Sequence, residues 1–254
     1  METIIFGNGP LGTSIHAALA EREMPVRMLG RPPDGTHDSF ELGRPSLAIE
    51  ASRGGAVASN VRAALAAGCR RLVIATTGWD ADRAAVERAI VAGQAAAVVA
   101  PNFSIGAAVF GRIVDEAAEL LGVVDGFEPY IVEWHRREKT DRPSGTARDL
   151  ARRVIARRRG RIHVASDDGE DAASPEALEV AAVRAGSSPG MHLVGFDSAS
   201  ETIELRLTAR DRNAYASGVV AAITWLTRTP RAAGVHPFDA VVDELLTTRL
   251  AATA

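Results

Sequence analysis

A charged stretch, YIVEWHRREKTDRPSGTA at residues 130–147, carries the side chains best suited to chemistry. His135 lies at or just past the end of an apolar segment, where a side chain can face a cleft, and Lys139 follows four residues later. Histidine titrates near neutral pH, so His135 is a candidate proton donor. A lone histidine is more often structural, and it is the cationic neighbours that favour catalysis here.

The second half of this stretch, DRPSGTARDLA, is typical of a loop that enters a helix, with Pro143 near the start and Ser144 or Thr146 as the cap. The N–H groups of Gly145 and Thr146 would lie at the helix N-terminus, where the helix dipole favours an anion. We expect a substrate carboxylate there, with Lys139 as its counter-charge. Simple helix capping explains the same residues and is compatible with this role.

A second candidate site is the glycine-rich segment GNGPLG at residues 7–12, which follows an apolar strand and opens a helix. That context is typical of a dinucleotide-binding loop, in which the first glycine permits a tight turn, the second lets the backbone approach a pyrophosphate, and the third allows close packing of helix and strand. A purely structural turn is the alternative. The loop residues that we expect to bind a cofactor are Gly7, Gly9, Pro10, Leu11 and Gly12.

The residues after the second expected strand indicate which nucleotide binds. NAD-specific sites place an acid there to hold the ribose hydroxyls, whereas this chain has VRMLGRP, with Arg27 and Arg31 and no acid. An arginine suits a 2′-phosphate, so the sequence favours NADPH, with NADH as the second choice. We assign Arg31, because Arg27 lies within the strand and can point away from the ligand. A solvent-exposed surface charge is the alternative for either arginine.

Two patterns of elements position these residues. Short apolar runs alternate with helical segments through the first hundred residues, which predicts a parallel sheet with helices on both faces. Four later segments follow, 127–135, 178–185, 190–198 and 201–209, and several of them contain the period-two alternation of a half-exposed sheet. We therefore expect an α/β fold, a Rossmann-type doubly wound parallel sheet, with a second α+β domain built on an open mixed or antiparallel sheet.

Composition excludes several classes of protein. The net charge of -3 over 254 residues argues against a general nucleic-acid binder, and we interpret the arginine-rich helix expected at 147–161 as a solvated face. The single cysteine, Cys69, fits a reducing compartment, and the scattered histidines show no zinc spacing, so we expect no metal. No apolar run is long enough to span a bilayer, and no secretory signal is evident. We expect a cytoplasmic protein with no membrane partner. The acidic segment 165–177 is interpreted as a loop or mobile flap.

Taken together, the motifs resemble those of the dihydrodipicolinate reductase family, also called 4-hydroxy-tetrahydrodipicolinate reductase, of lysine and diaminopimelate biosynthesis. The family signature E-x-H-H-x-x-K-x-D-x-P-S-G-T-A is similar to E-W-H-R-R-E-K-T-D-R-P-S-G-T-A at residues 133–147. VIATTGWD and APNFSIG resemble two further family segments, as do VRAGSSPGMHLVGFD and ETIELRLTARDRNAYASG. The resemblance thus covers nearly the whole chain.

The resemblance implies a nucleotide-binding domain formed by residues 1–103 and 213–254, and a substrate-binding and oligomerisation domain at 104–212 that forms a homotetramer. It implies that His135 is the general acid, that Lys139 and the amides of Gly145 and Thr146 bind a carboxylate, and that the substrate is a small anionic cyclic imine or enamine. The residues that it places along the nicotinamide ribose are Ala75, Thr76, Thr77, Ala100, Asn102 and Phe103.

The chain departs from the family pattern at Arg136, which replaces the family's second histidine and can bind a carboxylate bidentately. The glycine loop also differs from the family's G-x-x-G-R-M-G. These departures leave the substrate open. The leading hypothesis is the family's own reaction, and the first alternative is reduction of a different cyclic imine acid in specialised metabolism. The second alternative is a nucleotide-binding sensor without catalysis, against which the presence of both His135 and Lys139 argues.

Overall fold

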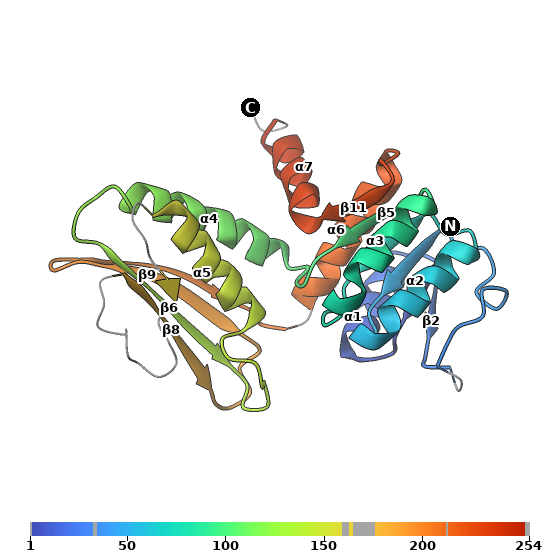
Figure 1. The fold of residues 1–254 in the computed structure, drawn as a ribbon, viewed down its shortest axis with the longest axis horizontal. Coiled ribbons are helices and arrows are strands. Elements are labelled where there is room, and N and C mark those ends of the chain that lie inside the picture. Colours follow the sequence, from blue (N-terminus) through green and yellow to red (C-terminus); the bar gives the residue numbers. More distant parts are fainter. Residues whose placement is uncertain (1, 33–34, 159–162, 165–175, 212, 252–254) are drawn as a thin grey trace. The chain divides into compact units, whose positions relative to one another are not determined.

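The computed structural model describes residues 2–32, 35–158, 163–164, 176–211 and 213–251. Most of the acidic segment expected to be a loop or flap, residues 165–175, lies outside this range. The chain forms two compact units (Figure 1). The split unit comprises Met1–Ile105 and Arg212–Ala254, and the central unit comprises Gly106–Asp211.

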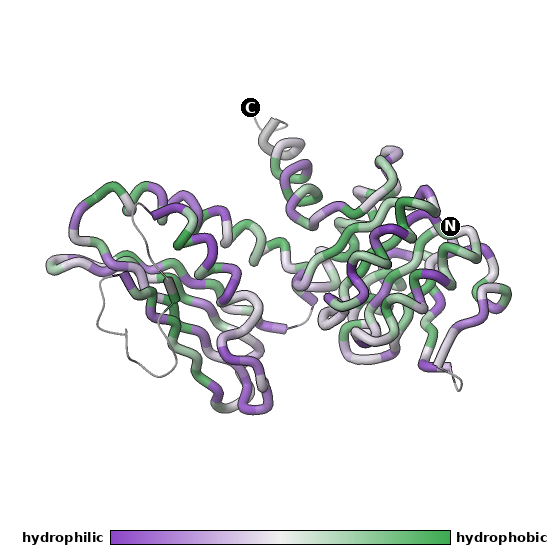
Figure 2. Tube along the Cα trace, in the orientation of Figure 1, coloured by the Kyte–Doolittle hydropathy of each residue, from purple (hydrophilic) through white to green (hydrophobic). Residues whose placement is uncertain are grey.

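The split unit contains a six-stranded sheet in the order β11-β5-β4-β3-β1-β2, in which every pair is parallel. Its central strands are buried on both faces, as the all-apolar runs require, and they form hydrophobic stretches of the trace (Figure 2). The strands are β1 (Thr3–Phe6), β2 (Val26–Leu29), β3 (Leu47–Glu50), β4 (Arg71–Ile74), β5 (Ala96–Val99) and β11 (Gly234–Pro237).

Helices cover both faces of this sheet (Figure 1). Helix α1 (Pro10–Ala20) packs against α6 (Asn213–Arg228) on one face, and α2 (Val57–Ala66) packs against α3 (Arg83–Ala92) on the other. Helix α7 (Phe238–Ala251) contacts α6 and β11. This is the doubly wound parallel sheet that the sequence predicts. Strand β11, which extends the sheet beyond β5, is not among the strands expected from the sequence.

The central unit contains a five-stranded mixed sheet in the order β10-β9-β6-β8-β7. Strand β6 is antiparallel to β9 and parallel to β8. The strands are β6 (Glu128–His135), β7 (His163–Val164), β8 (Ala177–Arg184), β9 (Met191–Asp197) and β10 (Thr202–Thr208). The expectation of a second α+β unit on an open mixed sheet is therefore confirmed.

One face of this second sheet is covered by α4 (Ile105–Leu121) and α5 (Gly145–Arg157) (Figure 1). Phe110 and Val114 of α4 and Val154 of α5 join Ile131 and Val194 of the strands in one core cluster. No described helix covers the opposite face, where Trp134 and Val183 lie. Helix α5 ends at Arg157, short of the end at 161 that the sequence suggested.

None of the helices within the described part of the chain is both long enough and apolar enough to cross a membrane.

Candidate active site

The glycine loop of the split unit connects β1 to α1, and its three glycines meet three different steric demands. Gly7 has a φ of 105°, and a Cβ there would lie 2.5 Å from the Ala51 carbonyl oxygen. Gly9 is the N-cap of α1, and a Cβ there would meet nothing within 4 Å. A Cβ at Gly12 would lie 2.1 Å from the Gly7 carbonyl oxygen. The loop therefore folds tightly on itself while its Gly9 backbone stays open to a ligand.

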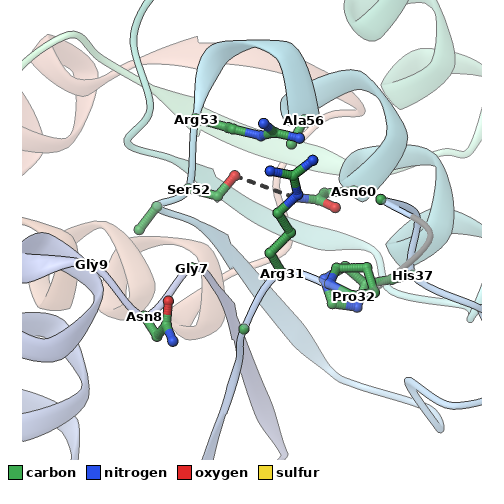
Figure 3. A pocket seen from close by; sticks show the side chains of 13 residues that line it. Gly7, Asn8, Gly9, Arg31, Pro32, His37, Ser52, Arg53, Ala56 and Asn60 are labelled. Atoms are coloured by element: carbon green, nitrogen blue, oxygen red, sulfur yellow. Dashed lines mark hydrogen bonds between the residues drawn. The ribbon is translucent and has the colours of Figure 1, made fainter.

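A pocket lies beside this loop, at the carboxyl ends of β1, β2 and β3. Because β2 and β3 flank β1 on opposite sides, the strand order reverses here, and open parallel sheets bind ligands at such a point. Pro10 is the first residue of α1 and Leu11 the second, so the loop opens directly into the helix. The residues that line the pocket include Gly7, Gly9, Arg31, Ser52, Arg53 and Asn60 (Figure 3).

Two arginines give this pocket a positive charge. Arg31 and Arg53 both line it, and in Figure 3 the Arg31 side chain extends toward the side formed by Asn60 and Arg53. Within the described ranges, neither guanidinium has a carboxylate partner at ion-pair distance. In contrast, Arg27 Nε lies 3.3 Å from Glu2 Oε1, and Arg27 Nη2 donates to the Leu42 carbonyl at 2.6 Å. The two pocket arginines are thus available to an anion, and Arg27 is engaged elsewhere.

A buried carboxylate, Glu50, holds two residues that line the pocket, Ser52 and Asn60. It accepts hydrogen bonds from the Ser52 amide at 2.9 Å, from Asn60 Nδ2 at 2.7 Å and from the Thr76 hydroxyl at 3.1 Å. Burial raises the pKa of Glu50, and these hydrogen bonds oppose that shift. Glu50 therefore connects the loop after β3 to the loop after β4.

The residues that the family resemblance places along the nicotinamide ribose follow β4 and β5 at the same edge of the sheet. Thr76 is fixed by Glu50, and its carbonyl accepts from Trp79 Nε1 at 2.8 Å. Phe103 is buried with its ring 4.9 Å from that of Phe238. The remaining members of the set also lie in these two loops: Ala75, Thr77, Ala100 and Asn102.

In the central unit, the turn after β6 places a cation beside the start of α5. This turn is a hydrophilic segment of the trace (Figure 2). Lys139 Nζ lies 2.7 Å from Asp141 Oδ1, so a second anion would share this charge with Asp141. Ser144 is the N-cap, with its hydroxyl accepting from the Ala147 amide at 3.2 Å. Gly145 and Thr146 are the first two residues of the helix, whose dipole favours an anion there.

His135 is the last residue of β6 and lies on the covered face of the sheet, where it is 7% exposed. Arg136, the next residue, is largely exposed, and its Nε is 4.0 Å from Glu138 Oε2. The structure thus separates two neighbours that the signature motif lists together. His135 belongs to a buried polar cluster, while Arg136 lies at the surface of the turn.

The buried cluster around His135 also contains Glu133, Arg184 and His192, contributed by β6, β8 and β9. Strand register explains the grouping, since His135 pairs with Arg184 and Glu133 with His192. Glu133 Oε1 accepts from Arg184 Nη2 at 2.6 Å and from the Ser144 amide at 2.9 Å. Glu133 Oε2 lies 3.3 Å from His135 Nδ1 and 3.9 Å from His192 Nδ1.

Burial and charge set the titration of this cluster. Burial alone would raise the pKa of Glu133, but hydrogen bonds from Ser144 and Arg184 hold it below its ordinary value. Burial lowers the pKa of His135, which the charge of Glu133 opposes. Burial, followed by the charge of His135, lowers the pKa of His192 to about 4. Glu133 is therefore ionised at neutral pH and His192 is neutral.

Carboxylate and imidazole groups this close together also occur in metal sites. The ligand atoms of Glu133, His135 and His192 all lie within 4.8 Å of one another. However, the Arg184 guanidinium already binds the carboxylate, and Lys139 adds a second positive charge nearby. These cations disfavour a further cation, so the arrangement favours hydrogen bonding over metal binding.

Five polar residues that the structure brings to these sites are not among those expected from the sequence. Arg53 and Glu50 belong to the pocket of the split unit, and Glu133, Arg184 and His192 surround or support the candidate acid. For the last three the available signal was a polar residue at a core-facing position of an alternating strand. Such a position is costly to fill with a polar group unless the group has a partner or a role.

Comparison with known proteins points to one family. A model described as dihydrodipicolinate reductase, C-terminus, matches residues 106–241. A protein of Methanosarcina barkeri named 4-hydroxy-tetrahydrodipicolinate reductase is 36% identical over 197 residues, which are 76% of this chain and 72% of that protein. A protein of Methanococcoides burtonii with the same name is 37% identical over 172 residues, 67% of this chain and 63% of that protein.

A solved structure with a similar fold is the dipicolinate-bound dihydrodipicolinate reductase from Paenisporosarcina sp. TG-14. It aligns with a TM-score of 0.70 at 20% sequence identity, covering 93% of this chain and 97% of that one. At this identity the likeness concerns the fold, and it confirms the Rossmann-type α/β architecture.

Proposed function

The chain belongs to the dihydrodipicolinate reductase family, and from this premise we propose that it reduces a small cyclic imine or enamine dicarboxylate with a nicotinamide nucleotide. It is an oxidoreductase of the dihydrodipicolinate reductase type, a family of lysine and diaminopimelate biosynthesis. The observation that carries the finer proposal is the juxtaposition of a buried histidine, His135, with the cationic turn that leads into α5. A proton donor and a carboxylate site thus lie in one part of the central unit.

The pocket of the split unit fits the adenosine end of NADPH. The open Gly9 backbone and the N-terminus of α1 suit a pyrophosphate, and the two arginines without carboxylate partners suit a 2′-phosphate. Residue 30, where an acid would select NADH, is glycine. The bound nucleotide would supply the hydride. We therefore propose NADPH as the preferred cofactor, with Arg31 and Arg53 as its phosphate ligands.

The substrate carboxylates are assigned to two groups of the central unit. The amides of Gly145 and Thr146 bind one carboxylate, with support from the helix dipole, and the Lys139 ammonium binds a carboxylate in competition with Asp141. His135 supplies the proton. Burial lowers the pKa of His135 and so favours the neutral imidazole in the free protein, whereas a bound anionic substrate favours the protonated form because opposite charges attract.

Arg136 supports a second candidate function, reduction of a different cyclic imine acid. It places an exposed, permanent cation next to the proton donor, where the family has a titratable histidine. A substrate with an additional or differently placed carboxylate would use this charge.

We also propose that the protein forms a homo-oligomer, a tetramer by family resemblance, through the sheet face that no described helix covers. Trp134 and Val183 are paired residues of β6 and β8 on this face, 40% and 45% exposed. A second copy would bury them. Trp134→Glu should shift the assembly to smaller species in sedimentation experiments, and an unchanged mass would place the interface elsewhere.

The test of the reductase proposal is an assay of NADPH oxidation by the purified protein. Freshly generated 4-hydroxy-tetrahydrodipicolinate is supplied first, followed by other cyclic imine acids. Turnover of the first substrate supports the family reaction, and turnover of another acid alone supports the second candidate. His135→Gln should reduce turnover about 100-fold or more while NADPH binding is retained, the scale expected for loss of general acid catalysis. Nucleotide binding without turnover of any acid would leave the sensor hypothesis and refute the reductase proposal.

A further inference from the structure

Glu133 is a buried carboxylate beside the proposed proton donor. It is fully buried on the covered face of β6. Strands β8 and β9 flank β6 in the sheet (Figure 1). Its two carboxylate oxygens have different environments. Oε1 accepts two strong hydrogen bonds, whereas Oε2 lies between the Nδ1 atoms of His135 and His192. Oε2 and both Nδ1 atoms are buried, and they form no hydrogen bond with any residue in the described ranges.

We propose that Glu133 is a positioning residue that accepts the Nδ1–H of His135 and so leaves Nε2 as the atom that exchanges a proton with the substrate. This inference rests on the proposed function, because it names the working nitrogen of the proposed acid. An ionised carboxylate only accepts hydrogen bonds, so an imidazole that binds it through Nδ1 must carry its proton there. The separation of 3.3 Å is a contact that closes by a small rotation of the ring, as catalytic hydrogen bonds often do when substrate binds.

The carboxylate is itself held in place. The Ser144 amide and Arg184 both donate to Oε1, which fixes the direction in which Oε2 points. Arg184 also donates to the Asp141 carbonyl, so it connects Glu133 to the turn that carries Lys139. The positioning of His135 is therefore built from the same groups that shape the carboxylate site.

A glycine lies at the opposite edge of the imidazole. Gly190 has a φ of 153°, and a Cβ there would lie 3.1 Å from His135 Nε2 and 3.3 Å from its Cδ2. A side chain at this position would cover the nitrogen that we assign to proton exchange. Glu133 on the Nδ1 side and Gly190 on the Nε2 side thus specify one orientation of the ring.

The sign of the effect on titration follows from the groups that face His135. Burial lowers the pKa of His135, Glu133 raises it, Lys139 and Arg184 lower it, and Asp141 raises it. His192, whose ring centroid is 5.1 Å away, is uncharged near neutral pH. Removing the negative charge of Glu133 therefore lowers the pKa of His135 further. His135 would then lose its proton at a lower pH, and with it the ability to act as the acid.

The experiment compares Glu133→Gln and Glu133→Asp with Glu128→Gln, the same change at an exposed position of the same strand. Glutamine can still accept from Ser144 and Arg184 through its carbonyl, but its amide donates, so His135 Nδ1 must become the acceptor. We expect kcat to fall about tenfold or more, with a smaller change in the substrate KM, and the alkaline limb of the pH profile to move to lower pH. Glu133→Asp should recover part of the loss, and Glu128→Gln should match the unmodified protein.

Nitrogen NMR of the histidine-labelled protein provides a readout that does not depend on turnover. In the unmodified protein the neutral His135 should carry its proton on Nδ1, and in Glu133→Gln on Nε2. An Nε2 proton in the unmodified protein, or an unchanged tautomer and pH profile in Glu133→Gln, would overturn the inference. Because the unmodified spectrum alone decides the tautomer, the test survives a variant that does not fold. It also separates this inference from the reductase proposal, which the turnover assay tests.

Discussion

Replacing Arg31 with alanine should shift the cofactor preference from NADPH toward NADH. Only NADPH carries the 2′-phosphate, and a charge-assisted hydrogen bond to a phosphate contributes about 1.5–3 kcal/mol, roughly ten- to a hundred-fold in binding. Arg31 and Arg53 are both exposed residues of the pocket. Because solvent screens their charges, we expect the binding free energy lost with either arginine to lie near the lower end of that range. We expect kcat/KM for NADPH to fall about tenfold in Arg31→Ala while the value for NADH changes little.

The assay measures kcat/KM for both nucleotides at a fixed, saturating concentration of the acid substrate. The double variant Arg31→Ala with Arg53→Ala should have a lower kcat/KM for NADPH than either single variant. Added salt should reduce the differences in this kcat/KM between the unmodified protein and the variants. Arg27→Ala is the matched control, because the Arg27 guanidinium binds Glu2 and the Leu42 carbonyl outside the pocket. If Arg31→Ala and Arg27→Ala leave the same ratio of NADPH to NADH activity, Arg31 does not bind the phosphate and the reasoning is refuted.

Three further predictions concern substrate binding, folding and pH. Lys139→Ala should lower kcat/KM for the acid substrate about ten- to a hundred-fold, the effect of one lost charged hydrogen bond, without changing the KM for NADPH. Steady-state kinetics in which the variant binds the acid and NADPH equally less well would contradict this. Gly12→Ala should destabilise the protein by about 1–3 kcal/mol in denaturant unfolding, because its Cβ would lie 2.1 Å from a carbonyl oxygen. Gly9→Ala, whose Cβ meets nothing within 4 Å, should be far milder in the same measurement, and similar losses would refute the steric argument. Because the acid must be protonated and burial lowers the pKa of His135, kcat/KM should fall as pH rises through that lowered pKa, and a profile flat up to alkaline pH would exclude His135 as the donor.

The regular elements of the split unit could be predicted from the sequence because their periodicity is local. The apolar runs of β1, β3, β4 and β5 are short and separated by helical segments, which is enough to predict a parallel sheet. Strand β11 is different. Its sequence, GVHP, contains a glycine and a proline and has no alternation, and it becomes a strand by pairing with the exposed edge of β5. Propensity carries no signal for such an edge strand.

The candidate site of the central unit likewise contains residues that are close in the sequence and residues that only strand pairing brings together. His135, Lys139, Gly145 and Thr146 lie within a dozen residues, so one motif contains them. Glu133 stands in that motif too, but its partners Arg184 and His192 come from two other strands. Only the register of β6 with β8 and β9 shows that these three charged or polar groups meet, and a single sequence does not specify that register.

The pairing of β11 with β5 also bears on the order in which the protein forms during synthesis. The central unit is continuous in the sequence, and its last strand, β10, precedes α6. The split unit needs α6 against α1 and β11 against β5, contacts that join its two distant segments. Contacts of such long sequence separation form late, because a long loop must close before they can contribute. In a growing chain, the whole central unit would therefore be available to fold before the sheet that carries the pocket beside the glycine loop is complete.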